Sequence, residues 1–443
     1  MTVRALAGLF MVTALAYAAR SFLPAGQTVT GSGAALAFGF LLIAALQIGH
    51  LADRIRFPHL TGYLLCGLLF GPEVLRIVSE PMLDDLTLVK GTAVGLIALL
   101  AGCELNLKRL RPALRAITSI SAITMVVTML ALWFVFYWVT SILPATAAMT
   151  AFQRGAIALV CANVLAAFSP AVVIGVITET RASGPLSQLC MSIVVLADLA
   201  MVVMFSITTT VARNAFPEAQ QSGGLTVLLE HIFGSILVGA VVGAVLALYS
   251  RRVGVRTGLM VFALLFIVAE AGRVLHLDPL LVGLTAGLLL ENASPVSGDD
   301  IVRATQPVTL PTFAIFFAVV GAEIHLQAFF HVAPFAAAGA LVRAAAIFAG
   351  SAIGARVGRV PPPTARLVPF GLLPQAGVAI ALAVLVLNDF PPWGRVLGTV
   401  LLGSIVVNEL VGPVLFRMAL SRAGEIATED DETAAVTALE PGR

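Results

Sequence analysis

The chain has 443 residues, and its 26 basic and 24 acidic side chains make up only 11% of it. A soluble globular protein carries about 25% charged residues. With 59% hydrophobic residues and a mean hydropathy of +1.01, the apolar content exceeds what a water-facing fold can bury. The composition therefore predicts a polytopic membrane protein. A net charge of +2 without a dense Lys/Arg run gives no sign of a nucleic-acid partner.

The first predicted element lies in residues 1–32. An apolar run follows Arg4 and ends in small residues near Ala18 and Ala19. This pattern fits either an extra N-terminal helix or a secretory signal sequence with a small-residue cleavage site. We expect the helix to be retained.

Residues 33–421 are predicted to form the transmembrane domain. A hydrocarbon core of about 30 Å needs about 20 apolar residues per helical crossing, and apolar stretches bounded by charge, Pro or Gly recur along this range. They lie at about 33–52, 58–77, 85–106, 114–141, 152–178, 184–211, 225–250, 256–275, 278–292, 304–325, 329–355, 364–388 and 394–420. The expected fold is all-α, with about 13–14 transmembrane helices.

Basic residues are concentrated in alternate loops, for example Arg251 and Arg252 after the stretch at 225–250. Because Lys and Arg accumulate in cytoplasmic loops, this pattern predicts a multi-pass protein of the plasma (inner) membrane with a cytoplasmic C-terminus. Residues 422–443 are acidic and poor in apolar residues, so we expect a disordered cytoplasmic tail.

Two pairs of similar stretches indicate an internal repeat. LTGYLLCGLLFG at 60–71 resembles LLVGLTAGLLL at 280–290, and LLAGCELNLKRL at 99–110 resembles AVVGAEIHLQAF at 318–329. The charge pattern places the first copy entering the membrane from the cytoplasm and the second from outside. The sequence thus predicts inverted-topology repeats at about 58–211 and 278–420, an arrangement found in secondary transporters.

Asp198 lies in the middle of the apolar stretch IVVLADLAMVV. A charge at the bilayer centre costs at least about 2.5 to 3.5 kcal/mol on insertion scales, so such a residue is a functional candidate. One carboxyl group can bind either a proton or a monovalent cation, and competition between the two is sufficient for exchange. The alternative is a buried carboxylate held by a neighbouring helix.

Pro170 and Pro374 interrupt one apolar stretch in each predicted repeat. A proline in mid-helix frees a carbonyl oxygen about one turn earlier, which is tolerated where the carbonyl lines a cavity. Two crossed discontinuous helices would thus offer oxygen atoms to a cation beside Asp198. Three neutral side chains near the prolines are further candidate ligands: Ser169, Asn163 and Gln375. Each is equally suited to a plain interhelical hydrogen bond.

Three further charges lie deep in apolar stretches and are candidates for structural or gating roles. Arg343, in GALVRAAAIFAG, needs a carboxylate or several carbonyl oxygens as partners. Glu270 and Glu409 are the candidate carboxylates, and we expect Arg343 to pair with Glu409. For Glu104 and Glu323, near helix ends, solvation at the membrane interface is the simpler interpretation.

Motifs of catalysis and of tight cofactor binding are missing from the sequence. The histidines are dispersed, the four cysteines are isolated, and no phosphate-binding loop or nucleophile elbow occurs. We therefore expect neither an enzyme nor a resident metal or cofactor, beyond an alkali cation transported at Asp198.

Taken in order, these stretches resemble the monovalent cation:proton antiporter superfamily, especially the bacterial branch with sodium/proton antiporters and Kef-type membrane domains. The resemblance spans most of residues 40–425. It is carried by HLTGYLLCGLLFGP, LLAGCELNLKRL, FSPAVVIGVI, VVLADLAMVV, GLTAGLLL, VVGAEIHL, LLPQAGVAIAL and NELVGPVLFRMAL. It implies a homodimer whose core domain holds two crossed, unwound helices and moves like an elevator, and it places the family's ion-binding aspartate on Asp198.

Departures from the family pattern bear on stoichiometry. Electrogenic members have an acidic residue immediately before the aspartate, where this chain has Ala197, and a lysine on the helix that here reads LPTFAIFFAVVG. The loss of both favours one proton per cation and hence electroneutral exchange. Phe168 stands where the family tends to have threonine, so one cation ligand is missing. The sequence contains no nucleotide-binding domain.

The leading interpretation is a Na⁺ or K⁺/H⁺ antiporter, embedded in membrane lipid, in which Asp198 binds cation and proton in turn. The first alternative is a non-transporting membrane receptor or scaffold with the same fold, suggested by Ala197 and Phe168. The second is a sodium-dependent symporter for an organic anion, which would require more polar groups in the core than the sequence offers.

Overall fold

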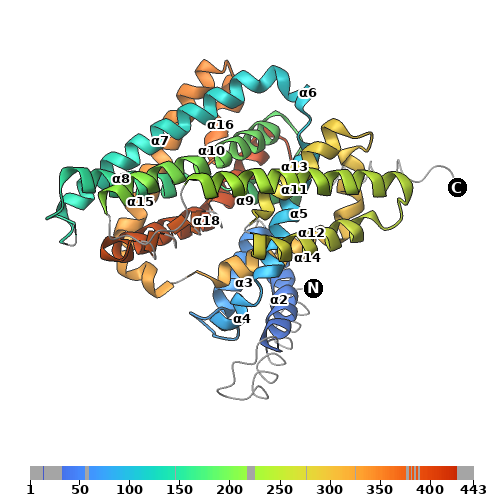
Figure 1. The fold of residues 1–443 in the computed structure, drawn as a ribbon, viewed down its shortest axis with the longest axis horizontal. Coiled ribbons are helices and arrows are strands. Elements are labelled where there is room, and N and C mark those ends of the chain that lie inside the picture. The colour runs from blue at the N-terminus through green and yellow to red at the C-terminus, as the bar shows by residue number, and fades with distance from the viewer. Residues whose placement is uncertain are drawn as a thin grey trace.

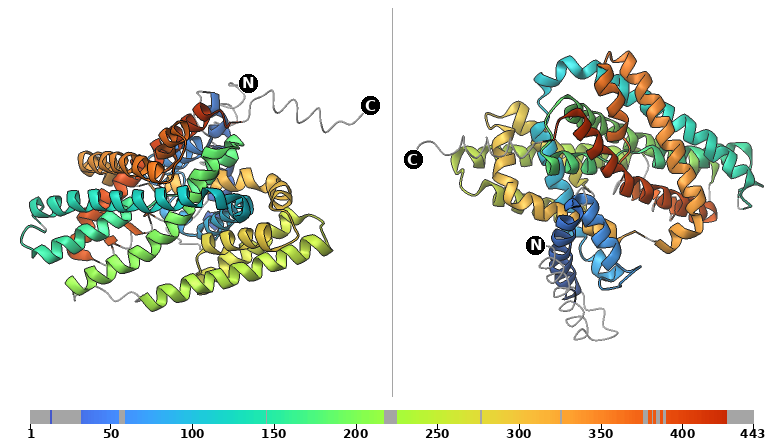
Figure 2. Two further views of the ribbon diagram at one scale, coloured as in Figure 1. Left: turned by 90° about the horizontal axis from the view of Figure 1, so that it is seen from above. Right: turned by 180° about the vertical axis from the view of Figure 1, so that it is seen from behind.

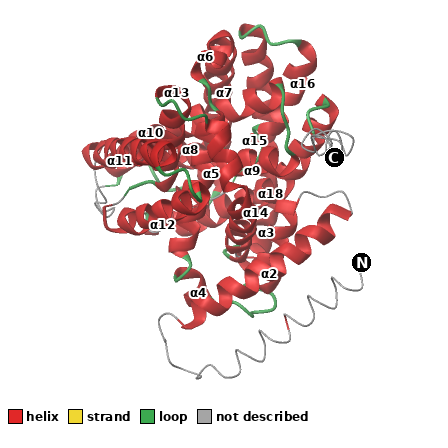
Figure 3. Ribbon diagram, turned by 90° about the vertical axis from the view of Figure 1, so that its right-hand side faces the viewer, coloured by secondary structure: helices red, strands yellow, loops and turns green. Residues whose placement is uncertain are grey.

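The computed structural model describes residues 13, 32–54, 59–144, 146–216, 225–275, 277–324, 326–375, 379–380, 382–383, 386–387 and 390–426. Within these residues the chain is helical and contains no strand (Figure 3). Nine helical spans in the described residues are long and apolar enough to cross a membrane, and one of them, Ala151–Thr180, contains a break. The prediction of an all-α polytopic membrane protein is confirmed. The predictions for residues 1–32 and for the tail fall almost wholly outside the described residues.

The helices pack in two groups (Figures 1 and 2). The first group contains the N-terminal helices and a later run of four. Its members are α2 (Ser32–Arg54), α3 (His59–Phe70), α4 (Glu80–Asp84), α5 (Thr87–Glu104), α11 (Leu225–Arg252), α12 (Thr257–Leu275), α13 (Pro279–Ala293) and α14 (Gly298–Ala322). In Figure 1 these are the blue and yellow segments in the lower and right-hand parts of the molecule, crossed by the long α11.

The second group contains the helices on which Asp198 and both prolines were predicted to lie. Its members are α7 (Leu114–Ile142), α8 (Ala151–Ala166), α9 (Pro170–Thr180), α10 (Pro185–Ala215), α15 (Leu326–Val357), α16 (Pro362–Gly371) and α18 (Pro391–Ala423). The short α6 (Leu107–Leu110) and the 3-10 helix η1 (Arg111–Ala113) lead into this group from α5. The two groups meet where α9 packs against α3 and α5, where α10 packs against α11, and where α18 packs against α3.

In the first group, helices of one predicted repeat pack against helices of the other. Helix α3 packs against α14, and α13 packs against α5. Helices α3 and α5 come from the first predicted repeat, whereas α13 and α14 come from the second. Each repeat therefore adds its first helix to the second helix of the other, as expected of two related halves. The inverted orientation of the two copies stays a prediction.

Glycines allow the backbones to touch at these crossings. A Cβ atom built on Gly67 of α3 would overlap the carbonyl oxygen of Ala318 on α14, and one built on Gly287 of α13 would overlap that of Leu99 on α5. Small residues are the usual means of close approach between membrane helices, because lipid supplies no hydrophobic drive for their association. The crossings thus hold the first group together.

The close crossing of α5 and α13 predicts a stability effect. Gly287→Ala is expected to destabilise the protein by about 1–3 kcal/mol, the range for overpacking, because the added methyl group meets backbone rather than a movable side chain. Gly39→Ala is the matched control, since a Cβ there has nothing within 4 Å. The melting temperatures of the two purified variants in detergent measure the difference. Equal values would contradict the close crossing.

Candidate ion-binding site

The first helix break separates α8 from α9. Helix α8 ends at Ala166, and α9 starts at Pro170 with Ser169 as its N-cap. The Ser169 Oγ accepts a hydrogen bond from the Val172 N–H at 3.3 Å, and proline suits the first helical position because its missing N–H has no partner there. Pro170 therefore starts a new helix and does not kink a continuous one. Ser169 caps this helix, so its hydroxyl already has a structural use.

The second break follows α16. This helix ends at Gly371, residues 372–375 are not helical, and helical residues resume at 379 in the described part of the chain. Pro374 lies in the break and packs against Gly412 of α18, where an added Cβ would come within 2.6 Å of the Pro374 Cα. Both interruptions predicted from the prolines are present in the structure.

Arg343 of α15 joins the two breaks. It is fully buried, and its guanidinium donates four hydrogen bonds to backbone carbonyl oxygens. They run from Nε to Leu165 (2.7 Å), from Nη2 to Ala167 (2.9 Å) and Leu372 (3.3 Å), and from Nη1 to Leu373 (2.7 Å). The last carbonyls of a helix have no partner within it and carry the negative end of the helix dipole. One cation thus satisfies the ends of both broken helices.

The expected pairing of Arg343 with Glu409 is wrong. All hydrogen bonds of the guanidinium go to carbonyl oxygens, and neither Glu409 nor Glu270 is a partner. Glu270 is exposed on α12 and belongs to the first helix group. The carbonyls are preferred because the breaks place several acceptors within reach of one planar, five-donor side chain.

Gln375 belongs to the same network. Its Nε2 donates to the carbonyl oxygens of Val164 (3.2 Å) and Leu165 (3.0 Å), and its Oε1 accepts from Asn408 Nδ2 at 2.9 Å. Of the two interpretations weighed for Gln375, the structure has the interhelical hydrogen bond. The sequence analysis missed Asn408, although it stands beside Glu409 as a polar residue within an apolar stretch.

Asp198 and Asn163 differ from this satisfied network. Asp198 of α10 is 4% exposed and Asn163 of α8 is fully buried, and the two helices pack against each other. Asp198 Oδ1 and both polar side-chain atoms of Asn163 have no hydrogen-bond partner. Leaving buried polar atoms unpaired costs about 1–3 kcal/mol each, so these groups are suited to a ligand that supplies the missing interactions.

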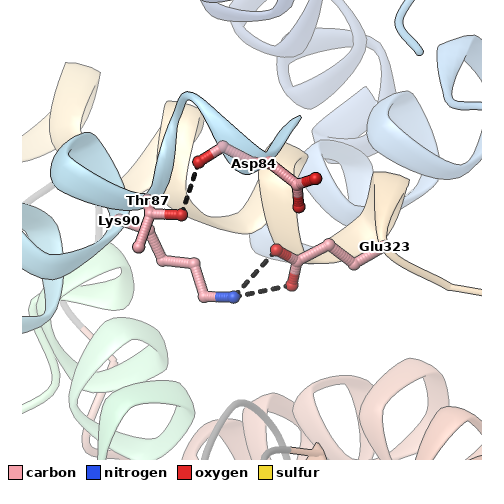
Figure 4. A network of polar contacts seen from close by, with 4 residues as sticks. All are labelled: Asp84, Thr87, Lys90 and Glu323. Atoms are coloured by element: carbon pink, nitrogen blue, oxygen red, sulfur yellow. Dashed lines mark hydrogen bonds and ion pairs between the residues drawn. The ribbon is translucent and has the colours of Figure 1, made fainter. Parts of the chain in front are cut away.

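A second set of charged residues lies near the start of α5, directly after α14 and within α18. Lys90 of α5 forms an ion pair with Glu323, the residue directly after α14, with Nζ at 2.7 and 2.8 Å from the two carboxylate oxygens (Figure 4). Glu323 lies at a helix end, as expected, and adds an ion pair to its partial exposure of 28%. Glu409 of α18 interacts electrostatically with Lys90 and Glu323. It is fully buried, and neither of its carboxyl oxygens has a hydrogen-bond partner.

Among the described residues, no group of three or more His, Cys, Asp or Glu side chains is arranged to hold a metal ion. The oxygen atoms near the breaks are instead carbonyls, one carboxyl group and neutral amides. Oxygen donors of this kind suit hard cations.

The comparison with known families decides the identity. Residues 38–422 match the family described as sodium/hydrogen exchanger, transmembrane. The chain belongs to the sodium/hydrogen exchanger family.

Solved structures share the fold of this exchanger. A structure of the sodium proton antiporter MjNhaP1 from Methanocaldococcus jannaschii at pH 8 is 16% identical, with a TM-score of 0.64 over 88% of this chain and 96% of that chain. An electron-microscopy structure of the same antiporter is 17% identical, with a TM-score of 0.66 over 88% and 98%. At this identity the similarity shows the fold alone. No curated protein sequence matches the exchanger.

Removal of the Arg343 guanidinium is expected to destabilise the exchanger by about 3 kcal/mol or more, because buried acceptors lose a charged donor. Arg343→Met tests this by melting temperature in detergent, and Arg343→Lys should fall between, since a lysine cannot fork between four acceptors. Arg303→Gln is the control, because Arg303 pairs with Asp300 on the surface with 71% and 60% of the side chains exposed. A melting temperature for Arg343→Met equal to that of the control would show that the four hydrogen bonds of Arg343 do not stabilise the protein.

Glu409 gives a second stability prediction. A buried carboxyl without partners gains nothing from its charge, so Glu409→Gln is expected to leave stability within about 0.5 kcal/mol of the wild type or to raise it. Glu323→Gln breaks the half-buried pair with Lys90 and should lower stability slightly, by up to about 1 kcal/mol. Chemical unfolding of both variants provides the comparison. If Glu409→Gln is the more damaging change, Glu409 has a charged partner.

Proposed function

We propose that this exchanger is an electroneutral antiporter that exchanges one monovalent cation, Na⁺ or K⁺, for one proton, with Asp198 binding the two in turn. The observation that carries the proposal is the buried carboxyl of Asp198, which has an unpartnered oxygen on a helix packed against the broken α8–α9 pair. An ionised carboxylate is costly in such surroundings without a counter-charge. The group is therefore suited to hold either a proton or a cation.

Few protein oxygen atoms around Asp198 are left to coordinate a cation. Asn163 offers a free amide oxygen, whereas the hydroxyl of Ser169 and the amide of Gln375 already make hydrogen bonds. Phe168 occupies the turn between Asn163 and Ser169 and stacks below the Arg343 guanidinium at 5.8 Å. The proposed ligands are thus Asp198 and Asn163, with water completing the coordination.

Two features support a one-to-one stoichiometry. Asp198 has no ion-pair partner in the described part of the chain, and the one buried cation near the breaks, Arg343, is already bound to four carbonyl oxygens. No basic side chain is therefore poised to take up or release a second proton as the cation leaves. Ala197 is fully buried where a second acid would stand.

We further propose that the second helix group moves relative to the first, as in an elevator-type cycle. The binding residues and both breaks lie on the second group, and at the boundary Gly175 of α9 approaches Leu60 of α3 and Phe317 of α14. At the end of α9, the Glu179 carboxylate accepts hydrogen bonds from the N–H groups of His59 and Leu60 at the start of α3, so this cap bond would have to break or move with the groups. A homodimer in the plasma (inner) membrane with a cytoplasmic C-terminus completes the proposal, supported by the family resemblance and the basic loops.

The test is transport in liposomes. Purified wild type with a trapped pH dye is challenged with Na⁺, K⁺ or Li⁺, with and without a membrane potential set by valinomycin. Cation-evoked proton movement should be insensitive to the potential and should fall to background in Asp198→Asn, because an amide cannot exchange a proton. Asp300→Asn, which removes an exposed acid, is the control. A potential-dependent rate refutes electroneutrality, and no response from folded wild type favours a receptor.

A further inference from the structure

Asp278 stands immediately before α13, at the boundary of the two helix groups. It is half-buried, and its Oδ1 accepts a hydrogen bond from the Leu280 N–H at 2.8 Å, which makes it the N-cap of α13. Its own N–H donates to Ser235 Oγ of α11 at 2.9 Å. These bonds fix the carboxyl group at the start of the helix.

The helix turns next to Asp278 and Asp198 line the same cavity, which places the two acids near each other. A small apolar cavity is lined by Pro170 of α9, Val195 of α10 and Leu280 of α13. Val195 is one turn before Asp198, and Leu280 is two residues after Asp278. The start of α9, the turn of α10 before Asp198 and the turn of α13 after Asp278 therefore border the same cavity.

Helix capping alone does not account for an acid at this position. Asn and Ser cap a helix as well as Asp does, whereas a second carboxylate close to a buried one adds repulsion, because neighbouring like charges disfavour each other. In the described part of the chain, Lys90 pairs with Glu323 and Arg303 with Asp300, whereas neither Asp198 nor Asp278 has such a partner to relieve this repulsion. The arrangement lacks a positive charge.

We propose that Asp278 is a second carboxylate of the cation site and that Asp198 and Asp278 hold one monovalent cation or one proton between them. The proposal deepens the proposed function and rests on it. Two neighbouring carboxylates share a single positive charge, so when the cation leaves and one proton binds, the net charge of the pair is unchanged. A second acid outside α10 is thus compatible with electroneutral exchange.

The two acids belong to different helix groups, which has a consequence for the cycle. Asp278 belongs to the first group and Asp198 to the second, so displacement of one group against the other changes their separation. The pair strengthens cation binding only in the arrangement described here. The charge-derived topology places Asp278 toward the extracytoplasmic end of α13, so that side is expected to show the higher apparent affinity.

The experiment separates charge from capping. Asp278→Asn keeps a capping side chain and removes the charge, Asp278→Ala removes both, and Asp300→Asn removes an exposed acid elsewhere. The first readout is Na⁺-dependent thermal stabilisation of each purified variant, which reports binding without turnover. The second is the KM for Na⁺ presented to either face of proteoliposomes with known orientation, repeated with K⁺.

Asp278→Asn should melt at the wild-type temperature without cation and should weaken Na⁺ stabilisation. Its KM should rise by at least about tenfold, as expected for loss of one charge near the ion, and the rise should be confined to one face. Asp278→Ala should also melt earlier. The proposal is overturned if Asp278→Asn binds and transports like wild type while Asp278→Ala is merely unstable. Absence of exchange in wild type would instead reject the proposed function, and the binding assay would still decide the role of Asp278.

Discussion

The hydrogen bonds from Arg343 to the two helix breaks are the interaction on which the centre of the molecule depends. Each break leaves carbonyl oxygens without helical partners in a region that excludes water, and each unsatisfied group there costs several kcal/mol. The guanidinium reaches Leu165, Ala167, Leu372 and Leu373 at once. An arginine is required because its donors lie in one plane and its charge is retained when buried.

Satisfaction of the breaks has a consequence for ion binding. Arg343 and Gln375 donate hydrogen bonds to the carbonyls at the end of α8, and Arg343 also to those after α16, while Asn408 holds Gln375 in place. Those oxygens are therefore not left to coordinate a cation. The unpaired polar atoms are found instead on Asp198 and Asn163. The structure thus divides the polar groups of the core into a satisfied network that holds the fold and a smaller unsatisfied set that is available to a ligand. This division supports a transported ion at Asp198 rather than within the breaks.

The contacts within the first helix group differ from those between the two groups, and the difference bears on which part of the molecule can move. Within the first group, glycines such as Gly67 and Gly287 bring backbones into direct contact, and such crossings resist sliding because each backbone fills the groove of the other. Between the groups, the contact is made by the short α9, by α10 against α11 and by α18 against α3. Asp198 and Asp278 lie on opposite sides of this boundary, so the charges that we assign to ion binding lie where the two groups can separate.

The amino-acid sequence by itself determined the membrane class, the helical fold, the family and the position of the buried aspartate, because composition, hydropathy and a mid-membrane charge are local properties of the chain. It also located both helix breaks, since proline acts on its own backbone. Only the tertiary structure decided the partners. Arg343 was expected to bind Glu409 but binds carbonyls, Glu323 pairs with Lys90, and Asp278 lies near Asp198 although the two residues are 80 positions apart in the sequence. Partner choice depends on which segments the helix crossings bring together, and residue spacing along the chain carries no record of those distances.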